Sequence, residues 1–210
     1  MFAGLASARD LRVTGTGRVE AFSDGVFAIA ITLLVLEIHV PDTAEIRAAG
    51  GLVRALLPLW PAFLSYLASF LTIGVIWLNH HRVFTVIVKV DRTLNWWNLM
   101  LLLTVAFIAF PNALVAQTLL EGVQSADARA AAAIYGVVFT LATMPWVFIW
   151  LHVRRHPELM GHHVAAAQWR IYILRPVIGL AIFAAAALLG LFLPVAALLL
   201  YIGLAVFFAL

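Results

Sequence analysis

The chain alternates between long apolar stretches and short polar segments. Six stretches approach or exceed the roughly 20 apolar residues that a helix needs to cross a bilayer core: 20–40, 52–77, 94–119, 130–152, 171–193 and 194–210. Hydrophobic residues make up 65% of the chain and charged residues 11%, far from the roughly 45–50% apolar share of soluble domains. The pattern therefore predicts an all-α integral membrane protein with six transmembrane helices in a lipid bilayer.

Prolines fall near the expected ends and bends of these helices. Pro41 should end the first, and Pro194 should mark the turn between the last two. Pro58 and Pro61 fit either the start of the second helix or a kink in it, and Pro111 predicts a kink in the third.

Lysine and arginine set the expected orientation. Ten of the thirteen lie in the N-terminal segment and the second and fourth connections: Arg9, Arg12, Arg18, Arg82, Lys89, Arg92, Arg154, Arg155, Arg170 and Arg175. Basic residues concentrate on the cytoplasmic side of membrane proteins. We therefore expect a plasma-membrane protein with both termini in the cytoplasm. The same rule explains the net charge of +3 and the pI near 9.8 without a nucleic-acid partner.

The N-terminal segment, 1–17, has no apolar core followed by a cleavage site, so we interpret it as a cytoplasmic lead and not a signal peptide. Residues 18–210 then form the membrane domain.

Catalytic and metal-binding patterns are missing from the sequence. There is no cysteine, no His-Glu-x-x-His, and no Ser-His-Asp or Gly-x-Ser-x-Gly arrangement. His80 and His81 are adjacent, as are His162 and His163, so on a helix each pair diverges by about 100°. We expect no enzyme, no cofactor and no resident metal. The linker histidines, including His156, are either solvated or sense pH.

The first span, "RVEAFSDGVFAIAITLLVLEI", has two different faces. At about 100° per residue, one stripe lies within about 60° of Ile29: Gly25, Thr32, Leu33 and Leu36. The opposite side carries Asp24, Ala28, Ile31 and Val35. One face is therefore apolar except for a hydroxyl, and the other begins with a carboxylate.

Asp24 has two interpretations. It could cap a helix, as Ser23 could also do, or it could join a buried polar network, because an ionisable group in a membrane helix is costly unless paired. Candidate partners come from "WLNHH" and "NWWN": Trp77, Asn79, His80, His81, Asn95, Trp96, Trp97 and Asn98. The tryptophans could equally form an interfacial belt.

The run Arg18-x-x-x-Phe22-Ser23-Asp24 at the start of a membrane helix resembles the transmembrane protein 175 family of potassium channels. The six-span layout and "WLNHH" extend the resemblance over most of the chain. It implies a homotetramer whose first helices line a central pore, with residues 18–210 as the six-helix channel domain. It also implies a structural role for the motif residues Arg18, Phe22, Ser23 and Asp24, supported by Trp77, His80 and His81.

Carried over by position, the resemblance places the pore constriction on Ile29, Leu33 and Leu36, and a hydroxyl ring linked to selectivity on Thr32. K⁺ would be the permeant ion among monovalent cations. Nothing resembles a Thr-Val-Gly-Tyr-Gly carbonyl filter, and a ring of apolar side chains can close a pore by dewetting. We expect Ile29 at the narrowest point and Thr32 to be exposed by a small rotation.

Other interpretations stay open at this point. A proton-coupled secondary transporter could use Asp24, His80 and His81 as a relay. Glu37, near the outer end, could attract cations as a ring or be an interfacial carboxylate. The small residues of "AIFAAAALLGLFL" favour close helix packing within the subunit.

Overall fold

The computed structural model describes residues 14–161 and 166–209 and is almost entirely helical. Its longer helices are α1 (Gly17–Leu33), α4 (Trp60–Val86), α5 (Arg92–Phe107), α6 (Ala109–Glu121), α7 (Ala126–Arg155), α8 (Ala166–Gly190) and α9 (Pro194–Ala209). Shorter elements are β1 (Thr14–Gly15), η2 (Leu34–Glu37), α2 (Thr43–Ala48), α3 (Leu52–Leu56), η3 (Leu57–Leu59), β2 (Lys89–Val90) and η4 (Pro157–Leu159). The all-α prediction is confirmed.

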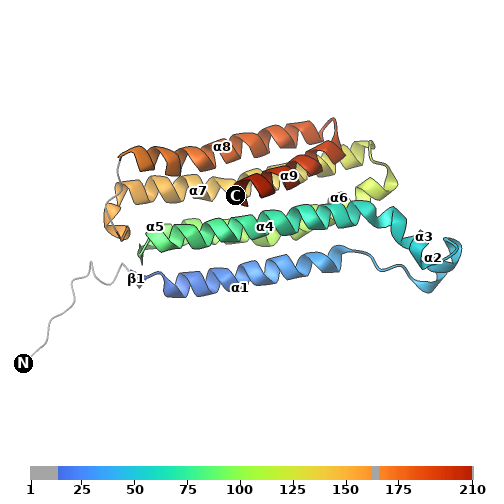
Figure 1. Cartoon of the computed structure of the whole chain (residues 1–210), viewed down its shortest axis with the longest axis horizontal. Helices are drawn as coiled ribbons and strands as arrows, with labels where there is room; N and C mark the ends of the chain where they lie inside the picture. The colour runs from blue at the N-terminus through green and yellow to red at the C-terminus, as the bar shows by residue number, and fades with distance from the viewer. Residues whose placement is uncertain (1–13, 162–165, 210) are drawn as a thin grey trace, which may run out of the picture.

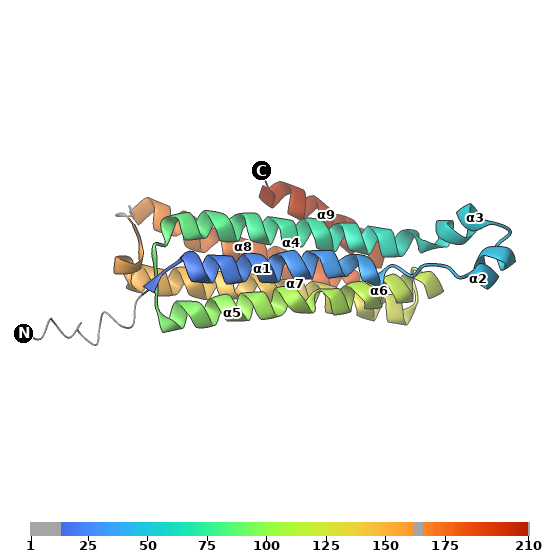
Figure 2. The same cartoon turned by 90° about the horizontal axis from the view of Figure 1, so that it is seen from below.

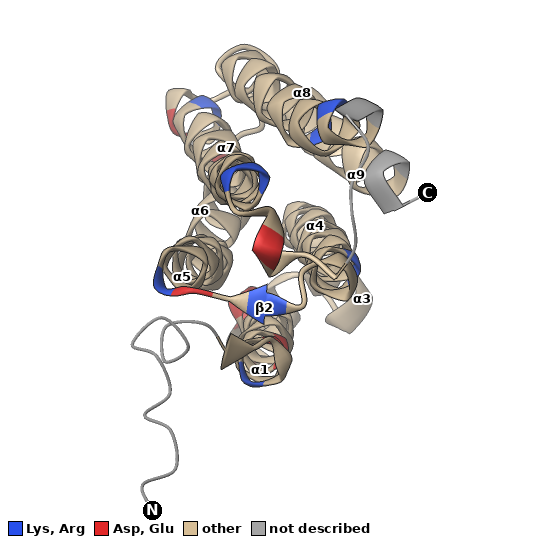
Figure 3. Cartoon of the chain, turned by 90° about the vertical axis from the view of Figure 1, so that its left-hand side faces the viewer, with Lys and Arg blue, Asp and Glu red and all other residues tan. Residues whose placement is uncertain are grey.

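The long helices run side by side along one axis (Figures 1 and 2). Helix α1 lies at one side of the bundle and packs on α4 and α5, while α8 lies at the opposite side against α7 and α9 (Figure 3). Helices α2 and α3 project beyond the bundle at the end away from β1 (Figure 1). The core thus lies between α4, α5, α7 and α9, and α1 covers only one edge of it.

Five segments are long and apolar enough to cross a membrane: Gly17–Glu37, Leu52–Val86, Arg92–Glu121, Ala126–Arg155 and Gln168–Gly190. The sixth predicted span forms an apolar helix, α9, but its 16 residues correspond to about 24 Å at 1.5 Å per residue. That is shorter than the roughly 30 Å hydrocarbon core. In Figure 2 the end of α9 lies partway along the bundle.

Proline positions explain where the observed helices differ from the predicted spans. Pro61 lies in the first turn of α4, where its missing N–H is harmless. Pro111 has no N–H to bond the carbonyl of Phe107, and the third span accordingly breaks at Ile108 between α5 and α6. The kink predicted in this span is therefore a short interruption.

The sequence pattern did not predict helix α2 or the pairing of β1 with β2. Asp42 accepts hydrogen bonds from the backbone of Ala44 and Glu45, both at 2.8 Å, and Glu45 bonds back to Asp42 N at 2.7 Å. This capping box starts α2 inside a segment expected to be a loop. At the other end, β1 pairs with β2, so the last residues of the lead are tied to the α4–α5 connection; residues 1–13 lie outside the described part of the chain.

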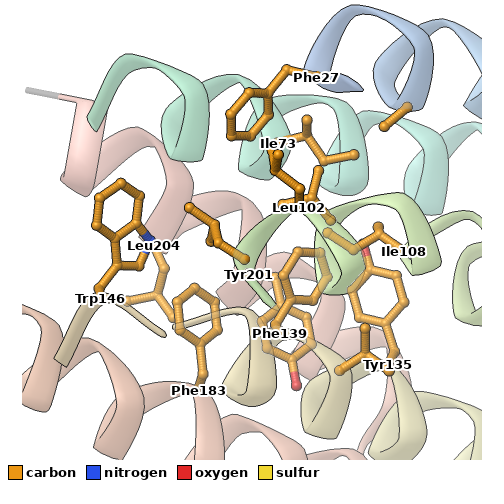
Figure 4. Close-up of a cluster of buried hydrophobic side chains, with 14 of the residues drawn as sticks. Phe27, Ile73, Leu102, Ile108, Tyr135, Phe139, Trp146, Phe183, Tyr201 and Leu204 are labelled. Carbon is orange, nitrogen blue, oxygen red and sulfur yellow. The ribbon is translucent and has the colours of Figure 1, made fainter. Parts of the chain in front are cut away.

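Small residues bring α7 and α8 close together, as the sequence predicted for this span. A Cβ at Gly136 would meet Ala187 Cα at 2.6 Å and also the hydroxyl of Tyr201. A Cβ at Gly190 would meet the backbone of Ala132 at 3.0 Å. Beside this contact, the rings of Tyr135, Phe139, Phe183 and Tyr201 pack together in the core (Figure 4).

Backbone hydrogen bonds join three segments at the β1 end of the bundle. Val88 N donates to Leu159 O at 3.0 Å, and Gly161 N donates to Val86 O at 3.1 Å, next to the β1–β2 pair. Figure 3 views this end and shows Lys and Arg residues, coloured blue on the ribbon, on several elements. The prediction that the basic segments share one end holds for their described residues.

Candidate functional site

Helix α1 has a buried face and an exposed face. Ser23, Phe27, Ala30 and Leu34 are buried against the bundle. The stripe predicted around Ile29 faces away, with exposed fractions of 61% for Ile29, 46% for Leu33 and 74% for Leu36. Only 22% of the α1 span is buried in the single chain, against 44–50% for α4, α5–α6 and α7. The exposed stripe is therefore available to lipid or to further subunits.

The stripe is straighter than the helical wheel suggested. From Leu34 to Glu37 the backbone is a 3₁₀ helix, in which side chains three residues apart eclipse one another. Leu36 therefore lies directly beyond Leu33, whereas an α-helix would rotate it by about 60°. The 3₁₀ turn also changes the direction in which Glu37 points, compared with an α-helix. The exposed side chain of Glu37 makes no hydrogen bond or ion pair with the described residues.

Thr32 is exposed beside this stripe, and its hydroxyl proton is already engaged. Its Oγ1 lies 2.8 Å from the carbonyl of Ala28 and 3.0 Å from that of Ile29, as donor in both cases. A hydroxyl has one proton and two lone pairs. The side that Thr32 presents away from its helix is therefore an acceptor, which suits a cation better than an anion.

A buried polar network fixes α1 to α4 and α5. The Asn98 amide donates to Ser23 Oγ at 2.9 Å, and Ser23 Oγ donates to its own helix at Val19 O at 2.7 Å. The Asn98 carbonyl oxygen faces His80 Nε2 at 2.9 Å. Since a carbonyl oxygen only accepts, His80 carries the proton on Nε2. All three side chains are at most 2% exposed, so one asparagine holds three helices together.

Asp24 is not a member of this buried network. It lies inside α1, whose N-cap is Thr16, so neither Asp24 nor Ser23 is an N-cap and that interpretation was wrong. Its Oδ1 accepts a hydrogen bond from Trp77 Nε1 at 2.9 Å, and both side chains are exposed in the single chain. The alternative interpretation, that Asp24 is buried in a polar network inside the subunit, was therefore also wrong, although Trp77 was among its predicted partners.

The remaining motif residues differ in their contacts. His81 stacks on Trp77 with ring centroids 6.5 Å apart, while His80 packs on Phe27 and Phe84. Arg18 and Phe22 are exposed and make no hydrogen bond, ion pair or ring contact with the described residues. The structural role expected for these two therefore stays a prediction.

A second polar cluster lies at the β1 end, outside the spans. Asp91 Oδ1 accepts from Leu94 N at 2.8 Å and so caps α5, while its Oδ2 lies 2.8 Å from His152 Nε2 at the end of α7. Partial burial raises the pKa of Asp91, but the hydrogen bonds from Leu94 and His152 outweigh it and hold that pKa below its ordinary value of 3.8. The carboxylate therefore joins two helix ends in its charged form.

One of the linker histidines lies beside a carboxylate. His156 is partly exposed, and its Nδ1 lies 3.1 Å from Glu158 Oε1. Two hydrogen bonds lower the pKa of Glu158 below its ordinary value. The backbone bond at Glu158 is the larger cause, and this bond with His156 is the second. His162 and His163 lie outside the described residues. Within residues 14–161 and 166–209, no three His, Asp or Glu side chains gather in a way that could hold a metal ion.

Sequence reasoning missed one buried cluster. Ser69 Oγ lies 3.0 Å from Asn112 Oδ1 and 2.8 Å from Tyr135 Oη, which links α4, α6 and α7. Polar residues within apolar spans were the available signal, because they are costly in a bilayer unless they find partners.

Comparison with known proteins agrees with these features. A protein-family model described as "Endosomal/lysosomal potassium channel TMEM175" matches residues 18–109. "Potassium channel Cha6605_3372" of Chamaesiphon minutus is 45% identical over 146 residues, which cover 70% of this chain and 70% of that protein. The human "Endosomal/lysosomal proton channel TMEM175" is 45% identical over 96 residues, covering 43% of this chain and 18% of its own.

A solved structure extends the likeness to the whole fold. The crystal structure of a lysosomal potassium-selective channel TMEM175 homolog from Chamaesiphon minutus aligns with a TM-score of 0.79 and 38% identity. The alignment covers 92% of this chain and 96% of that one. The described helices are thus those of a TMEM175 channel fold.

Proposed function

Because the chain belongs to the TMEM175 family of channels, we propose that it is a potassium-permeable cation channel of the plasma membrane, with α1 lining the pore. The observation that carries this proposal is the exposed stripe on α1. Ile29, Leu33 and Leu36 point away from the bundle, while the opposite face of the same helix is fixed by buried polar contacts. A helix held on one side and apolar on the other is suited to line a symmetric pore.

Several subunits must supply the other walls. One exposed helix cannot enclose a channel, and symmetric repetition of the same surface is the ordinary solution. We propose a homotetramer of six-helix subunits, with α9 as the sixth helix. The end that gathers Lys and Arg faces the cytoplasm in this arrangement.

Ion passage would be controlled at the stripe. A ring of Ile29 side chains closes the pore by excluding water, and no carbonyl filter is needed. Thr32 lies one turn from Leu36 and presents hydroxyl lone pairs, because its proton is engaged by α1 itself. A ring of such oxygens replaces part of the water around K⁺, and Glu37 at the outer end of α1 adds negative charge that attracts cations.

The test is ion flux into liposomes that contain the purified full chain. Ile29→Asn should raise K⁺ flux about tenfold or more, because a hydrated ring removes the dewetting barrier. Ile178→Asn is the matched control: it makes the same exchange at an exposed position of α8, on the opposite side of the bundle, and should leave flux unchanged. Equal flux from Ile29→Asn and the parent would refute the constriction.

Proton passage is a second candidate that one observation favours. The human relative is named a proton channel, and the transporter interpretation of Asp24, His80 and His81 also involves protons. The same liposomes under H⁺ gradients, with Asp24→Asn as the variant, separate the two. H⁺ flux that is lost in Asp24→Asn while K⁺ flux persists would favour the proton route.

A further inference from the structure

The bundle contains a second feature, a cavity of about 370 Å³ on the side away from α1. It lies between α4, α7, α8 and α9 and is within the range of roughly 300–1,000 Å³ typical of ligand sites. On α4 its walls extend from Thr72 to Val86, about 20 Å at 1.5 Å per residue. The space is therefore long and narrow and runs along the helices.

Most of this cavity behaves as an apolar surface. Its side chains include Val75, Ile76, Phe139 and Phe183. The two threonines in its wall, Thr72 and Thr143, donate their hydroxyl protons to carbonyls of their own helices at 2.8 and 2.9 Å. A hydrocarbon chain fits such walls, because both threonine hydroxyl protons are already bonded within their own helices.

Two arginines form the polar part of the wall. Arg82, one turn from the end of α4, and Arg175 on α8 both line the cavity. Neither guanidinium makes a hydrogen bond or ion pair with the described residues. Asn79, also in the wall, lies one turn before Arg82. Two unneutralised charges above an apolar slot are complementary to an anionic head group with an acyl chain.

We propose that this cavity binds an anionic phospholipid, with its phosphate on Arg82 and Arg175 and one acyl chain along α4. Arginine forks bind phosphate oxygens through paired hydrogen bonds, and Arg82, one turn from the end of α4, can reach toward the membrane interface. The basic end of the bundle places this lipid in the cytoplasmic leaflet, where anionic lipids concentrate.

The proposed occupant would also contact the supports of α1. Trp146 lines the cavity, and its ring lies 6.1 Å from that of His80, edge to face. A bound chain therefore packs against a residue next to the Ser23–Asn98–His80 network. The proposal does not depend on the ion that the protein conducts, and its test measures lipid alone.

Native mass spectrometry of the purified full-length oligomer gives the test. Phosphatidylglycerol and phosphatidylcholine with identical acyl chains are titrated, and phosphatidylglycerol should bind more tightly. Arg82→Gln with Arg175→Gln should weaken phosphatidylglycerol about thirtyfold, from two basic contacts near the interface, and abolish the preference. Arg154→Gln with Arg155→Gln, at exposed positions of the same end, removes equal charge and should change affinity less than threefold.

Two further arms keep the test decisive if the double variant fails to assemble. Val75→Phe fills the cavity and retains both arginines, so both lipids should bind at least tenfold more weakly. Glycerol phosphate, a head group without a chain, should not displace phosphatidylglycerol at millimolar concentration. Equal losses in the two arginine pairs, unchanged binding to Val75→Phe, or displacement by glycerol phosphate would each overturn the proposal.

Discussion

Asn98 offers the sharpest test of how α1 is held. Its side chain is 2% exposed and bonds both Ser23 and His80 at 2.9 Å. Asn98→Ala removes both hydrogen bonds and leaves His80 Nε2, which has no other hydrogen-bond partner among the described residues, unpaired. Interhelical hydrogen bonds in membranes average about 0.6 kcal/mol, with a maximum near 1.7, and an unsatisfied buried group adds roughly 1–3 kcal/mol. We expect a loss of about 2–4 kcal/mol in unfolding free energy.

The measurement is equilibrium unfolding in mixed micelles as the fraction of SDS increases, followed by tryptophan fluorescence. Asn95→Ala is the matched control: Asn95 lies in the first turn of α5, its side chain makes no hydrogen bond to another helix within the described residues, and its replacement should cost about 0.5 kcal/mol or less. Ser23→Ala should cost less than Asn98→Ala and couple to it in a double-mutant cycle. If Asn98→Ala unfolds like Asn95→Ala, the network does not hold α1.

Two further predictions concern other parts of the bundle. Since the pKa of Asp91 is held below its ordinary value, its ionised form stabilises the fold above about pH 4, and this contribution disappears as the pH falls through the lowered pKa. The unfolding free energy measured from pH 6 to 3 should therefore decline more steeply in the parent than in Asp91→Asn. Parallel curves would contradict the reasoning. Gly136→Ala should lower the midpoint of thermal unfolding and cost about 1–3 kcal/mol, because the added methyl meets Ala187 Cα at 2.6 Å; Gly203→Ala, with open space at its Cβ position, should have little effect.

The sequence predicted the parts of this fold that depend on single helices. The apolar stretches, the break caused by Pro111 and the face of α1 that carries Ile29 all follow from local spacing and backbone chemistry. The switch to a 3₁₀ turn after Leu33 could not be read from the wheel, since the wheel assumes one helix type throughout. The capping box at Asp42 and Glu45 was legible in the sequence and was overlooked.

Residue spacing alone could not decide which side chains form hydrogen bonds with Asp24 and Ser23. Trp77, His80, His81 and Asn98 were all near the same depth as Asp24, and any of them could have paired with it. The structure divides them: Trp77 bonds Asp24 at the exposed edge, whereas Asn98 bonds both Ser23 and His80 in the core. Rotation of α1 about its axis decides this, and that rotation depends on packing across helices distant in sequence.

The hydrogen bonds of the hydroxyl groups bear on how the protein is made. Ser23, Thr32, Thr72, Thr104, Thr118, Thr140 and Thr143 each donate to a carbonyl of their own helix. These seven hydroxyl protons can therefore already be bonded within their own helices when those helices leave the translocon for lipid. Asn98 and His80 have no such internal partner, so the α4–α5 hairpin enters the bilayer with a polar pair to satisfy within itself. Helix α1, synthesised first, is then captured through Ser23 once that hairpin has arrived.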